Sequence, residues 1–410
     1  MVRLIALLAL LLFVEIYSFQ AFKTIVDKDW MLLAYKIINA ALFAFILFTF
    51  LNFDRSVGQT QKTLFASGLL LLIYVPKMMV SLLMFGEDLY RLGAGTVSYF
   101  VNSDKGALEF TGRRKFISQI GFGLAAVPFL SLMYGIFEGK YNYKVIRQTL
   151  FFPDLPEAFE GMTITQISDV HSGSFDNPEK IEYAIDLINK QKSDILLFTG
   201  DLVNTLATEM HPWIDTFKKI ETPKYGKYSV LGNHDYGEYV TWDTEELKQK
   251  NFEDIKDLHR QIDFKLLLNE HILLEKESDK VAIVGVENWG THFKKLGDLD
   301  KASEGLSTED FKILMSHDPS HWDVEVKNHK KNFHLTLSGH THGMQFGIEI
   351  PGIVKWSLAQ YVYKQWAGLY KEMGRYIYVN RGFGFHAYPG RVGIWPEITV
   401  LELKKSKNIV

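Results

Sequence analysis

The sequence predicts an α/β domain with mixed β-sheets that follows an N-terminal bundle of about four membrane-spanning helices. Four long apolar runs occupy the first third of the chain, and each approaches the roughly 20 residues that a helix needs to cross a bilayer. Farther along, short aliphatic or β-branched runs first alternate with helical patterns and then follow one another, as in α/β domains with mixed sheets. Polar segments rich in Asp, His and Gly follow several of these runs, and open α/β sheets place their sites at such strand ends.

The predicted transmembrane domain covers residues 1–138, with spans at about 4–22, 30–51, 64–85 and 116–137. A single run of this kind is also typical of a buried helix or, at the N-terminus, of a cleaved signal peptide. Four runs in succession favour membrane spans, and the first run lacks a convincing small-residue cleavage site. We therefore expect the first run to remain as a span.

Three charged residues, Glu15, Lys36 and Lys77, interrupt the apolar runs. A charge within a span faces the bundle, reaches for the interface or marks a function. The sequence shows no pairing between these three residues. We therefore expect a structural placement for them and no transporter-like role for the spans.

The distribution of Lys and Arg predicts the orientation in the membrane, because short cytoplasmic connectors are enriched in both. The first and third connectors carry most of these residues: Lys23, Lys28, Arg91, Lys105, Arg113, Arg114 and Lys115. The third connector leads into Thr-Gly-Arg-Arg-Lys-Phe-Ile, which resembles a twin-arginine export signal and fits a plain topological anchor equally well. Both interpretations place the arginines inside. We therefore expect a multi-pass protein of the cell membrane with its C-terminal domain on the extracytoplasmic side.

Composition excludes several other classes of protein. The net charge of −3 gives no reason to expect a nucleic-acid partner. The chain contains no Cys, so disulfides, thiolate metal sites and Cys nucleophiles are excluded. No obligate protein partner is evident from the sequence.

After the spans, residues 139–160 are predicted to form a linker and a first strand, residues 161–404 the main domain, and residues 405–410 a tail. Apolar residues at helical spacing predict helices after Pro178 and over residues 208–219 and 244–262. The predicted strands of the main domain lie at residues 163–167, 195–198, 228–231, 272–274, 281–286, 311–315, 335–337, 376–379 and 398–403.

Five polar segments follow predicted strands of the main domain. They are Ser168-Asp169-Val170-His171, Gly200-Asp201-Leu202-Val203-Asn204, Gly232-Asn233-His234-Asp235, Ser316-His317-Asp318 and Ser338-Gly339-His340-Thr341-His342-Gly343. Their donor atoms are carboxylate oxygens, imidazole nitrogens and one amide oxygen, a set that suits Mn, Fe or Zn. A carboxylate in such a set can be shared between two ions.

In order and residue type, these segments resemble the calcineurin-like metallophosphoesterases, whose pattern is D-x-H, G-D, G-N-H-D/E, a single His and G-H-x-H. The resemblance covers residues 163–403 and points to a membrane-anchored bacterial type. It implies a metallophosphoesterase-type sandwich of two mixed β-sheets flanked by helices. One difference lies in Gly343-Met344-Gln345, where Gly-Gly-Gln is often found, and this difference affects loop shape without removing a ligand.

The resemblance also implies two divalent metal ions, with Mn, Zn and Fe as candidates. Its ligand assignment gives Asp169, His171 and His342 to the first ion, Asn233, His317 and His340 to the second, and Asp201 to both. A metal-activated hydroxide would attack phosphorus in this arrangement.

Two further residues of the third segment have catalytic roles in the resemblance. His234 would donate a proton to the leaving group, since an imidazole titrates near neutral pH. Asp235, the next residue, would orient it. Both are therefore predicted to be catalytic.

The substrate side of the site is less defined in the sequence. Arg381, in a Gly-rich segment after a strand, and Arg391 are candidates for binding a phosphate, and a Gly-rich turn with a solvated Arg explains the segment equally well. His386 and Tyr388 are candidates for the border of the pocket. Aromatic residues between residues 356 and 370 would form an apolar lip for a lipid tail, lie at the membrane interface or belong to the core.

These observations predict a membrane-anchored two-metal phosphohydrolase or phosphodiesterase that cleaves phosphoester or pyrophosphate bonds, with a lipid-linked substrate as one option. A pyrophosphatase of the UDP-diacylglucosamine type, on the route to lipid A, is the alternative, although a cytoplasmic domain would suit that substrate better. An alternative of another class is a non-catalytic membrane receptor or scaffold. Lost ligands would mark such a protein, and no ligand of the pattern is missing.

Overall fold

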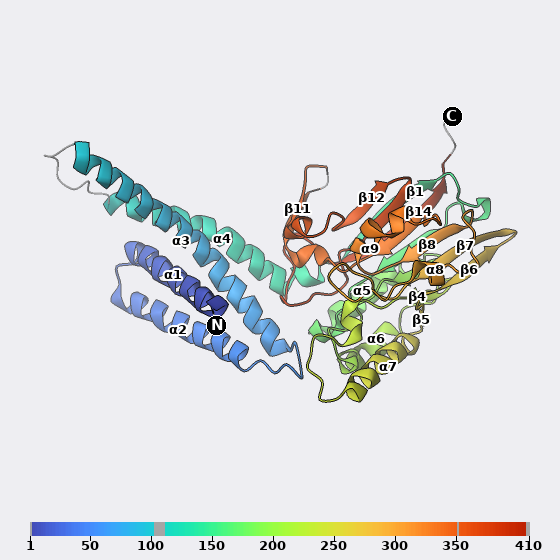
Figure 1. Ribbon diagram of the computed structural model, residues 1–410. Helices are drawn as coiled ribbons and strands as arrows, with labels where there is room; N and C mark the ends of the chain where they lie inside the picture. Colours follow the sequence, from blue (N-terminus) through green and yellow to red (C-terminus); the bar gives the residue numbers. More distant parts are fainter. Residues whose placement is uncertain (1, 102–110, 351, 407–410) are drawn as a thin grey trace. The chain divides into compact units, whose positions relative to one another are not determined.

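A computed structural model describes residues 2–101, 111–350 and 352–406 (Figure 1). Lys105 and most of the predicted tail lie outside these residues. The chain divides into two compact units. The first comprises residues 1–53 and 62–137, and the second comprises residues 54–61 together with the chain from residue 138 onward.

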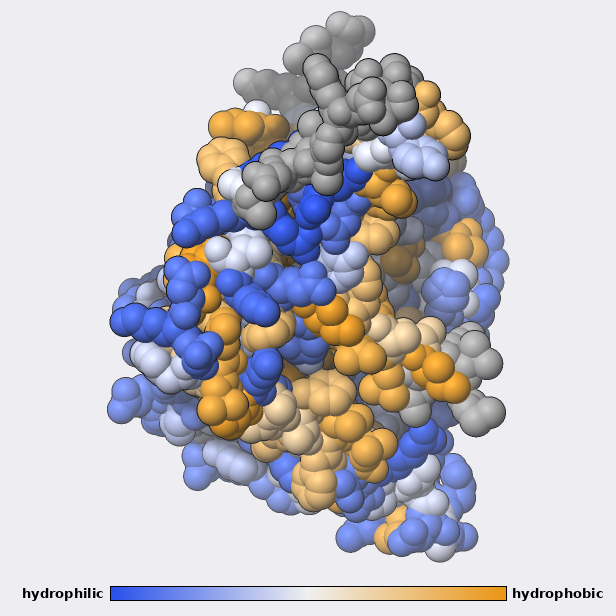
Figure 2. Space-filling model, turned by 90° about the vertical axis from the view of Figure 1, so that its left-hand side faces the viewer, coloured by the Kyte–Doolittle hydropathy of each residue, from blue (hydrophilic) through white to orange (hydrophobic). Residues whose placement is uncertain are grey.

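The first unit consists of four long helices, each apolar and long enough to cross a membrane. They are α1 (Val2–Ile25), α2 (Asp29–Leu51), α3 (Gln61–Val101) and α4 (Thr111–Phe137). Helix α1 packs against α2 and α4, and many large apolar side chains of all four helices remain exposed. Hydrophobic surface spreads over much of the face in Figure 2. Helix α3 reaches Val101, well beyond the predicted span, so Arg91 is a helical residue.

Two of the intramembrane charges are paired, which the sequence did not show. Lys77 Nζ lies 2.6 Å from Glu15 Oε1 and 2.5 Å from Asn39 Oδ1. The three residues come from α3, α1 and α2 and are far apart in sequence, which local periodicity cannot reveal. Glu15 and Asn39 also line a cavity of about 580 Å³ between α1 and α2. The pair belongs to the interior of the helix bundle.

Two six-stranded mixed sheets form the framework of the second unit, as predicted (Figure 1). The first sheet has the order β1 (Lys144–Phe152), β14 (Glu397–Lys405), β2 (Thr163–Ile167), β3 (Ile195–Phe198), β4 (Lys227–Ser229) and β5 (Lys265–Leu266). The second sheet has the order β12 (Gly368–Glu372), β13 (Arg375–Val379), β9 (Leu335–Ser338), β8 (Phe311–Met315), β7 (Asp279–Gly285) and β6 (Glu270–Lys276).

The parallel strands of each sheet bring several motif segments to one edge. Strands β2, β3, β4 and β5 are mutually parallel, and so are β13, β9, β8 and β7. Because the carboxyl ends of adjacent parallel strands meet at the same edge, the segments that follow β2, β3 and β4 lie together. Those that follow β8 and β9 do the same in the second sheet.

The core lies between the sheets and on their outer faces. Ile164 and Leu197 of the first sheet pack with Ile283, Ile313 and Leu337 of the second, and all are buried. The outer face of the first sheet is covered by α5 (Pro178–Asn189), α6 (Ile214–Phe217) and α7 (Glu245–Gln261). The outer face of the second sheet is covered by α8 (Leu299–Ala302) and α9 (Pro319–Val324).

Local signals explain the helices that the sequence predicted correctly. The side chain of Asn177 accepts from the amide of Lys180, and Pro178 occupies the first turn of α5, a favourable start for a helix. Thr244 caps α7 in the same way by accepting from Leu247 N. The helix predicted over 208–219 is mostly the 3₁₀ segment η4 (Ala207–Trp213) followed by the short α6. It contains Pro212, whose ring disfavours a regular helix interior.

Two other segments differ from the sequence analysis. Residues 139–141 form η1, a buried 3₁₀ turn rather than an open linker. Its Lys140 and Tyr141 both bind Asp176, with Nζ–Oδ2 and Oη–Oδ1 distances of 2.5 and 2.6 Å. The aromatic segment after the last motif contains the hairpin β10 (Gly347–Ile350) and β11 (Val354–Ser357), together with β12, none of which was predicted.

Candidate active site

Each predicted ligand lies on a short loop or turn directly after a strand. Asp169 and His171 follow β2, Asp201 follows β3, and Asn233 opens the 3₁₀ turn η5 (Asn233–Tyr236) after β4. His317 follows β8, and His340 and His342 follow β9. The two sheets therefore contribute their polar strand ends to one site.

The backbone at this site is strained. Five of the predicted ligands adopt positive φ: Asp169 at 53°, His171 at 48°, Asp201 at 59°, His340 at 69° and His342 at 49°. The left-handed conformation is unfavourable for residues with a side chain, and such strain persists where the surroundings impose it and concentrates at functional sites. The strain thus indicates that this arrangement serves a function.

Two glycines of the motifs are required by close approach. A Cβ on Gly339 would overlap Ser168 Oγ and Asp169 Oδ2, and a Cβ on Gly232 would overlap Asp201 Oδ1. Both glycines face a carboxylate of the predicted ligand set. They allow the loops from different strands to pack directly against these carboxylates.

The first group of predicted ligands comes together. Asp169, His171 and His342 place one potential ligand atom each within 4.8 Å of one another. His342 Nε2 lies 3.2 Å from Asp169 Oδ1 and 3.0 Å from His171 Nε2. These three side chains are buried and offer one carboxylate and two imidazoles.

The second group forms beside the first. Asp201, His317 and His340 also place ligand atoms within 4.8 Å of one another. Asp201 Oδ2 lies 3.1 Å from His317 Nε2 and 3.6 Å from His171 Nε2, so this oxygen faces both groups. Asn233 Oδ1 is buried without a hydrogen-bond partner among the described residues. An orphaned acceptor at this position fits a metal ligand.

Hydrogen bonds at the far side of two imidazoles fix their tautomers. His171 Nδ1 lies 3.1 Å from Asn204 Oδ1, and His317 Nδ1 lies 2.7 Å from the carbonyl oxygen of Thr199. An oxygen acceptor at Nδ1 requires the hydrogen there, which leaves the lone pair on Nε2. Both Nε2 atoms face Asp201 and are ready to bind a cation. The buried oxygen and nitrogen donors of the two groups therefore fit divalent metal ions.

The electrostatics of Asp201 and His317 agree with a cation site. Burial acts to raise the pKa of Asp201, but the neighbouring imidazoles, above all His317, outweigh burial and hold that pKa well below its ordinary value. Burial acts to lower the pKa of His317, but Asp201 outweighs it and raises the pKa to about 10. A proton on His317 thus occupies the place that a metal ion would take.

His234 lies in the site, but its partner differs from the one predicted. Its Nδ1 lies 2.6 Å from the carbonyl oxygen of Asn204, and its ring stacks on Tyr239 at 4.2 Å between centroids. Asp235 instead accepts from the amides of Asp201 and Gly232, at 2.9 Å each, and from Leu202 at 2.9 Å. Both oxygens of Asp235 thus accept from backbone amides, and the partner of the His234 ring is the carbonyl group of Asn204 instead.

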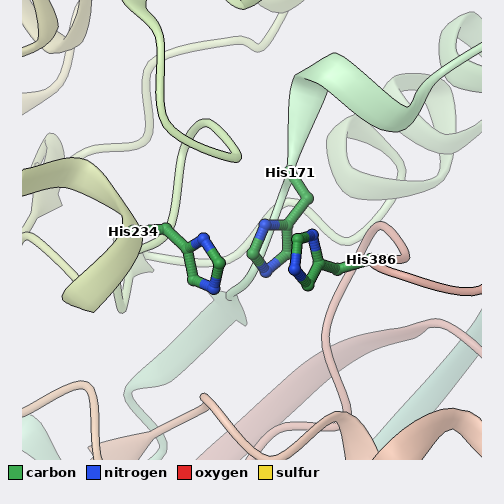
Figure 3. A group of neighbouring side chains, drawn as sticks. All are labelled: His171, His234 and His386. Atoms are coloured by element: carbon green, nitrogen blue, oxygen red, sulfur yellow. The ribbon is translucent and has the colours of Figure 1, made fainter. Parts of the chain in front are cut away.

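A third imidazole completes this side of the site. His386 approaches His171 and His234 from a loop near the C-terminus, with ring centroids 4.9 and 4.6 Å away (Figure 3). The three histidines form a further group whose ligand atoms lie within 4.8 Å of one another. His386 Nδ1 lies 3.2 Å from Asn204 Oδ1. The side chain and carbonyl group of Asn204 therefore contact all three imidazoles.

Several residues near the ligands were missed by the sequence analysis. Asn233 Nδ2 donates to the hydroxyl of Tyr239 at 2.6 Å, and the Tyr363 hydroxyl lies 2.8 Å from His340 Nε2. Asn204 stands three residues after Asp201, and this spacing was the only local signal for it. Tyr239 carries no motif that would have identified it, and Tyr363 was expected only as one of the aromatic residues of a lip, the membrane interface or the core. His386, a candidate for the border of the pocket, does lie beside His171 and His234.

The two arginines predicted to bind substrate are held by internal partners. Arg381 pairs with Glu349, with an Nη2–Oε1 distance of 2.5 Å, and with Glu397, with an Nη1–Oε2 distance of 2.5 Å. Arg391 is buried and donates to the carbonyl oxygens of Arg381 and Gly384 at 2.8 and 2.9 Å. Burial lowers the pKa of Arg391 to about 10. Its Nη2 lies 3.0 Å from His342 Nδ1, so it braces the loop beside a predicted ligand.

Comparisons with known proteins agree with this geometry. The family model of the calcineurin-like phosphoesterases matches residues 162–344, and a model described as a probable calcineurin-like phosphoesterase transmembrane domain matches residues 2–140. The uncharacterized metallophosphoesterase YkuE of Bacillus subtilis is 30% identical over 303 residues, which cover 72% of this chain and 98% of YkuE.

A transmembrane protein with a metallophosphoesterase domain from Danio rerio is 26% identical over 67% of this chain and 60% of that protein. The structure of the NAD nucleotidase of Haemophilus influenzae matches 54% of this chain and 45% of its own, with 13% identity and a TM-score of 0.36. Family models, a full-length relative and the meeting of all five motif segments agree, and the chain belongs to the calcineurin-like metallophosphoesterases, in a form with four apolar helices before the catalytic domain.

Proposed function

We propose that the protein is a membrane-anchored phosphohydrolase that uses two divalent metal ions to cleave phosphoester or pyrophosphate bonds. The observation that carries this proposal is the position of Asp201. One of its carboxylate oxygens faces His171 of the first group and His317 of the second. A shared carboxylate between two ligand groups is the arrangement of two-metal hydrolases.

The two groups support a division of the ligands like the one that the resemblance implies. Asp169, His171 and His342 would hold one ion, Asn233, His317 and His340 the other, and Asp201 both. When bound, such a pair supplies Lewis-acid polarisation of a phosphoryl oxygen and a water of lowered pKa. The donors contain no thiolate, which favours Mn, Fe or Zn.

The chain itself supplies a proton donor beside this pair. Because His234 Nδ1 donates to the Asn204 carbonyl, any proton that His234 exchanges with a substrate moves through Nε2. Burial lowers the pKa of His234, which makes its protonated form a stronger acid but reduces the fraction of His234 that is protonated near neutral pH. His234 is proposed as the general acid because of its position beside the ligand groups, and Asp235 supports it by holding the loop after β3.

Arg381 and Arg391 are proposed to act on substrate through the loop that they brace. Arg381 connects this loop to the β10–β11 hairpin through Glu349, and Arg391 fixes its carbonyl groups. Their replacement is expected to alter the pocket next to His342. Direct binding of a phosphate would first require one of these internal contacts to break.

The substrate class is proposed to be a lipid-linked phosphoester or pyrophosphate, because four apolar helices tether the site to a membrane. The test is a hydrolysis screen of the purified, detergent-solubilised full chain with Mn, Zn, Fe or Mg, across nucleotide, phospholipid, lipid-pyrophosphate and simple diester substrates. We expect metal-dependent hydrolysis that is strongest for a lipid-linked substrate. If no substrate is hydrolysed with any of these metals, the proposed function is contradicted and a receptor or scaffold is favoured.

The catalytic domain is proposed to lie on the extracytoplasmic side, because the basic residues near α4 favour the cytoplasm. Single Cys residues can be introduced at Ser103, outside the described residues, and at Ser406, since the chain has no Cys. A membrane-impermeant maleimide applied to intact cells should label Ser406→Cys and not Ser103→Cys. The opposite labelling would place the domain in the cytoplasm and favour the lipid A precursor as substrate.

A further inference from the structure

The connector between α2 and α3 belongs structurally to the catalytic unit. Residues 54–61 join two apolar helices, yet they group with the catalytic unit rather than with those helices. Gly58 of this connector is buried. Its φ is +73°, and a Cβ there would come within 2.8 Å of Val240 Cγ1. The connector is therefore packed against the catalytic unit at a position where only glycine fits.

Directed hydrogen bonds hold the connector in this position. The amide of Thr241 donates to the carbonyl oxygen of Arg55 at 2.8 Å. Gln61 Nε2 donates to the carbonyl oxygen of Phe175 at 3.1 Å. Gln59 uses both ends of its amide: Oε1 accepts from Ala387 N at 2.8 Å, and Nε2 donates to Ser174 Oγ at 3.1 Å.

Each segment that the connector contacts follows a histidine of the site in sequence. Ser174 and Phe175 follow His171, Val240 and Thr241 follow His234, and Ala387 follows His386. These are the three histidines that converge in Figure 3. The connector thus contacts the loop behind each of the three imidazoles.

A chain of hydrogen bonds leads from Gln59 to these imidazoles. Ser174 Oγ, which accepts from Gln59, donates to Asn204 Oδ1 at 3.3 Å. The same oxygen of Asn204 lies 3.1 Å from His171 Nδ1 and 3.2 Å from His386 Nδ1. Gln59 therefore supports His386 twice, through Ser174 and Asn204 and through the backbone of Ala387.

We propose that Gln59 is a positioning residue of the active site and that residues 54–61 clamp the loops that carry His171, His234 and His386. The effect that we expect of this clamp on turnover rests on the proposed function. Residues 54–61 lie between the end of α2 at Leu51 and the start of α3 at Gln61, so a displacement of these two helix ends relative to each other would change the orientation of the histidines. The membrane helices then act on the site as well as anchoring it.

The test replaces Gln59 in the full-length, detergent-solubilised protein. Gln59→Met keeps the length of the side chain and removes both hydrogen bonds, and Val57→Ala, on an exposed residue of the same connector, is the matched control. We expect Gln59→Met to lower kcat about 10-fold, as loss of an outer support of a metal site does. KM should change less, and bound metal should remain. Amide hydrogen exchange should accelerate at residues 172–175 and 386–388 in this variant alone.

Unchanged exchange and unchanged kcat in Gln59→Met would overturn the proposal. An equal loss in Val57→Ala would do the same, since the effect would then not depend on the two hydrogen bonds. A wild-type protein that hydrolyses no substrate would contradict the proposed function, while the exchange measurement would still decide whether the clamp exists.

Crosslinking in the Cys-free chain tests the contact itself. Arg55→Cys with Thr241→Cys should be joined by a short bis-maleimide in native membranes, because these two residues share a backbone hydrogen bond. Arg55→Cys with Lys276→Cys, at the β6–β7 hairpin, is the control pair and should remain unjoined. Joining of the control pair alone, or of neither pair, would show that the connector does not pack as described.

Discussion

Two sets of residues build the site, and they come from different kinds of structure. The first, which we call the ligand set, consists of the proposed metal ligands at strand ends: Asp169, His171, Asp201, Asn233, His317, His340 and His342. The orienting set lies on loops between elements and consists of Gln59, Asn204, Tyr239, Tyr363 and His386. The ligand set would bind the metal ions, whereas most residues of the orienting set contact the opposite side of a proposed ligand or of His234.

The difference between the sets has an energetic consequence. A ligand contributes directly to binding of a doubly charged ion, so its loss removes a large interaction. An orienting residue fixes the tautomer or the angle of a ligand, and its loss typically costs about 10–100-fold in affinity or activity. Changes in the ligand set should therefore abolish function, and changes in the orienting set should reduce it.

The largest effect is expected from Asp201→Asn. The carboxylate faces both groups, and the amide that replaces it carries no charge to share between two ions. Turnover should fall by more than about 100-fold, the upper range for outer-sphere residues, while circular dichroism shows a folded domain. Asp154→Asn, on an exposed carboxylate, is the control and should keep full turnover. If Asp201→Asn binds two metal ions and keeps near-normal turnover, the distinction between the ligand set and the orienting set has no basis.

His234→Ala separates proton donation from metal binding. Rates on alkyl esters, whose leaving groups are basic, should fall about 10²–10⁴-fold, as for loss of a general acid. Rates on p-nitrophenyl esters should fall much less, and metal content should remain. Equal losses on both kinds of ester would show that His234 has another role.

The grouping of the ligand-set residues at one site was predictable from the sequence, because each follows a β-strand within a short motif. The order of the strands in the sheets then brings the motifs together, so the local sequence pattern and the fold both place these residues at one site. An α/β domain with mixed sheets was predictable for the same reason, whereas the sandwich of two sheets was implied by the family resemblance. Glu15 and Lys77 show the limit, because their pairing depends on packing between helices that are distant in sequence.

Most residues of the orienting set reach their positions through packing between segments that are distant in sequence. Gln59 reaches Ser174 and Ala387 across more than one hundred positions of sequence, and nothing in residues 54–61 predicts that contact. Asp235 was expected to orient His234 because the resemblance implies an acid beside this histidine and Asp235 is the next residue. The 3₁₀ turn η5 instead directs its carboxylate to the amides after β3.

Asn204→Ala tests how much the orienting set contributes to turnover and metal affinity, because Asn204 contacts more imidazoles than any other residue of that set. The change removes Oδ1, which contacts His171 and His386, and keeps the backbone carbonyl that binds His234. We expect turnover and metal affinity at the first group to fall about 10–100-fold. If the ratio of the variant's rates on alkyl and p-nitrophenyl esters stays at the wild-type value, His234 still acts as the general acid. Asn328→Ala on the surface should have no effect, and a loss below twofold in Asn204→Ala would contradict the assigned role.

Metal removal should make stability depend on pH in a defined direction. In the metal-free protein Asp201 raises the pKa of His317 to about 10, above its ordinary value of 6.5. The protonated imidazole therefore stabilises the fold fully below about pH 6.5, and this contribution is lost as pH rises toward 10. Thermal unfolding with a chelator should show a falling Tm over this range, which His317→Gln should flatten. A metal-free Tm that is independent of pH between 6.5 and 10 would contradict the His317–Asp201 pair.

The account is tested most directly by counting metal ions against turnover. The metal-free full chain is titrated with Mn, and bound metal and hydrolysis of a p-nitrophenyl diester are measured at each step. The account predicts saturation at two ions per chain, with most of the turnover gained as the second ion binds, and no such gain for Asp201→Asn. Full turnover with one ion per chain, or two bound ions without metal-dependent hydrolysis, would contradict a two-metal site bridged by Asp201.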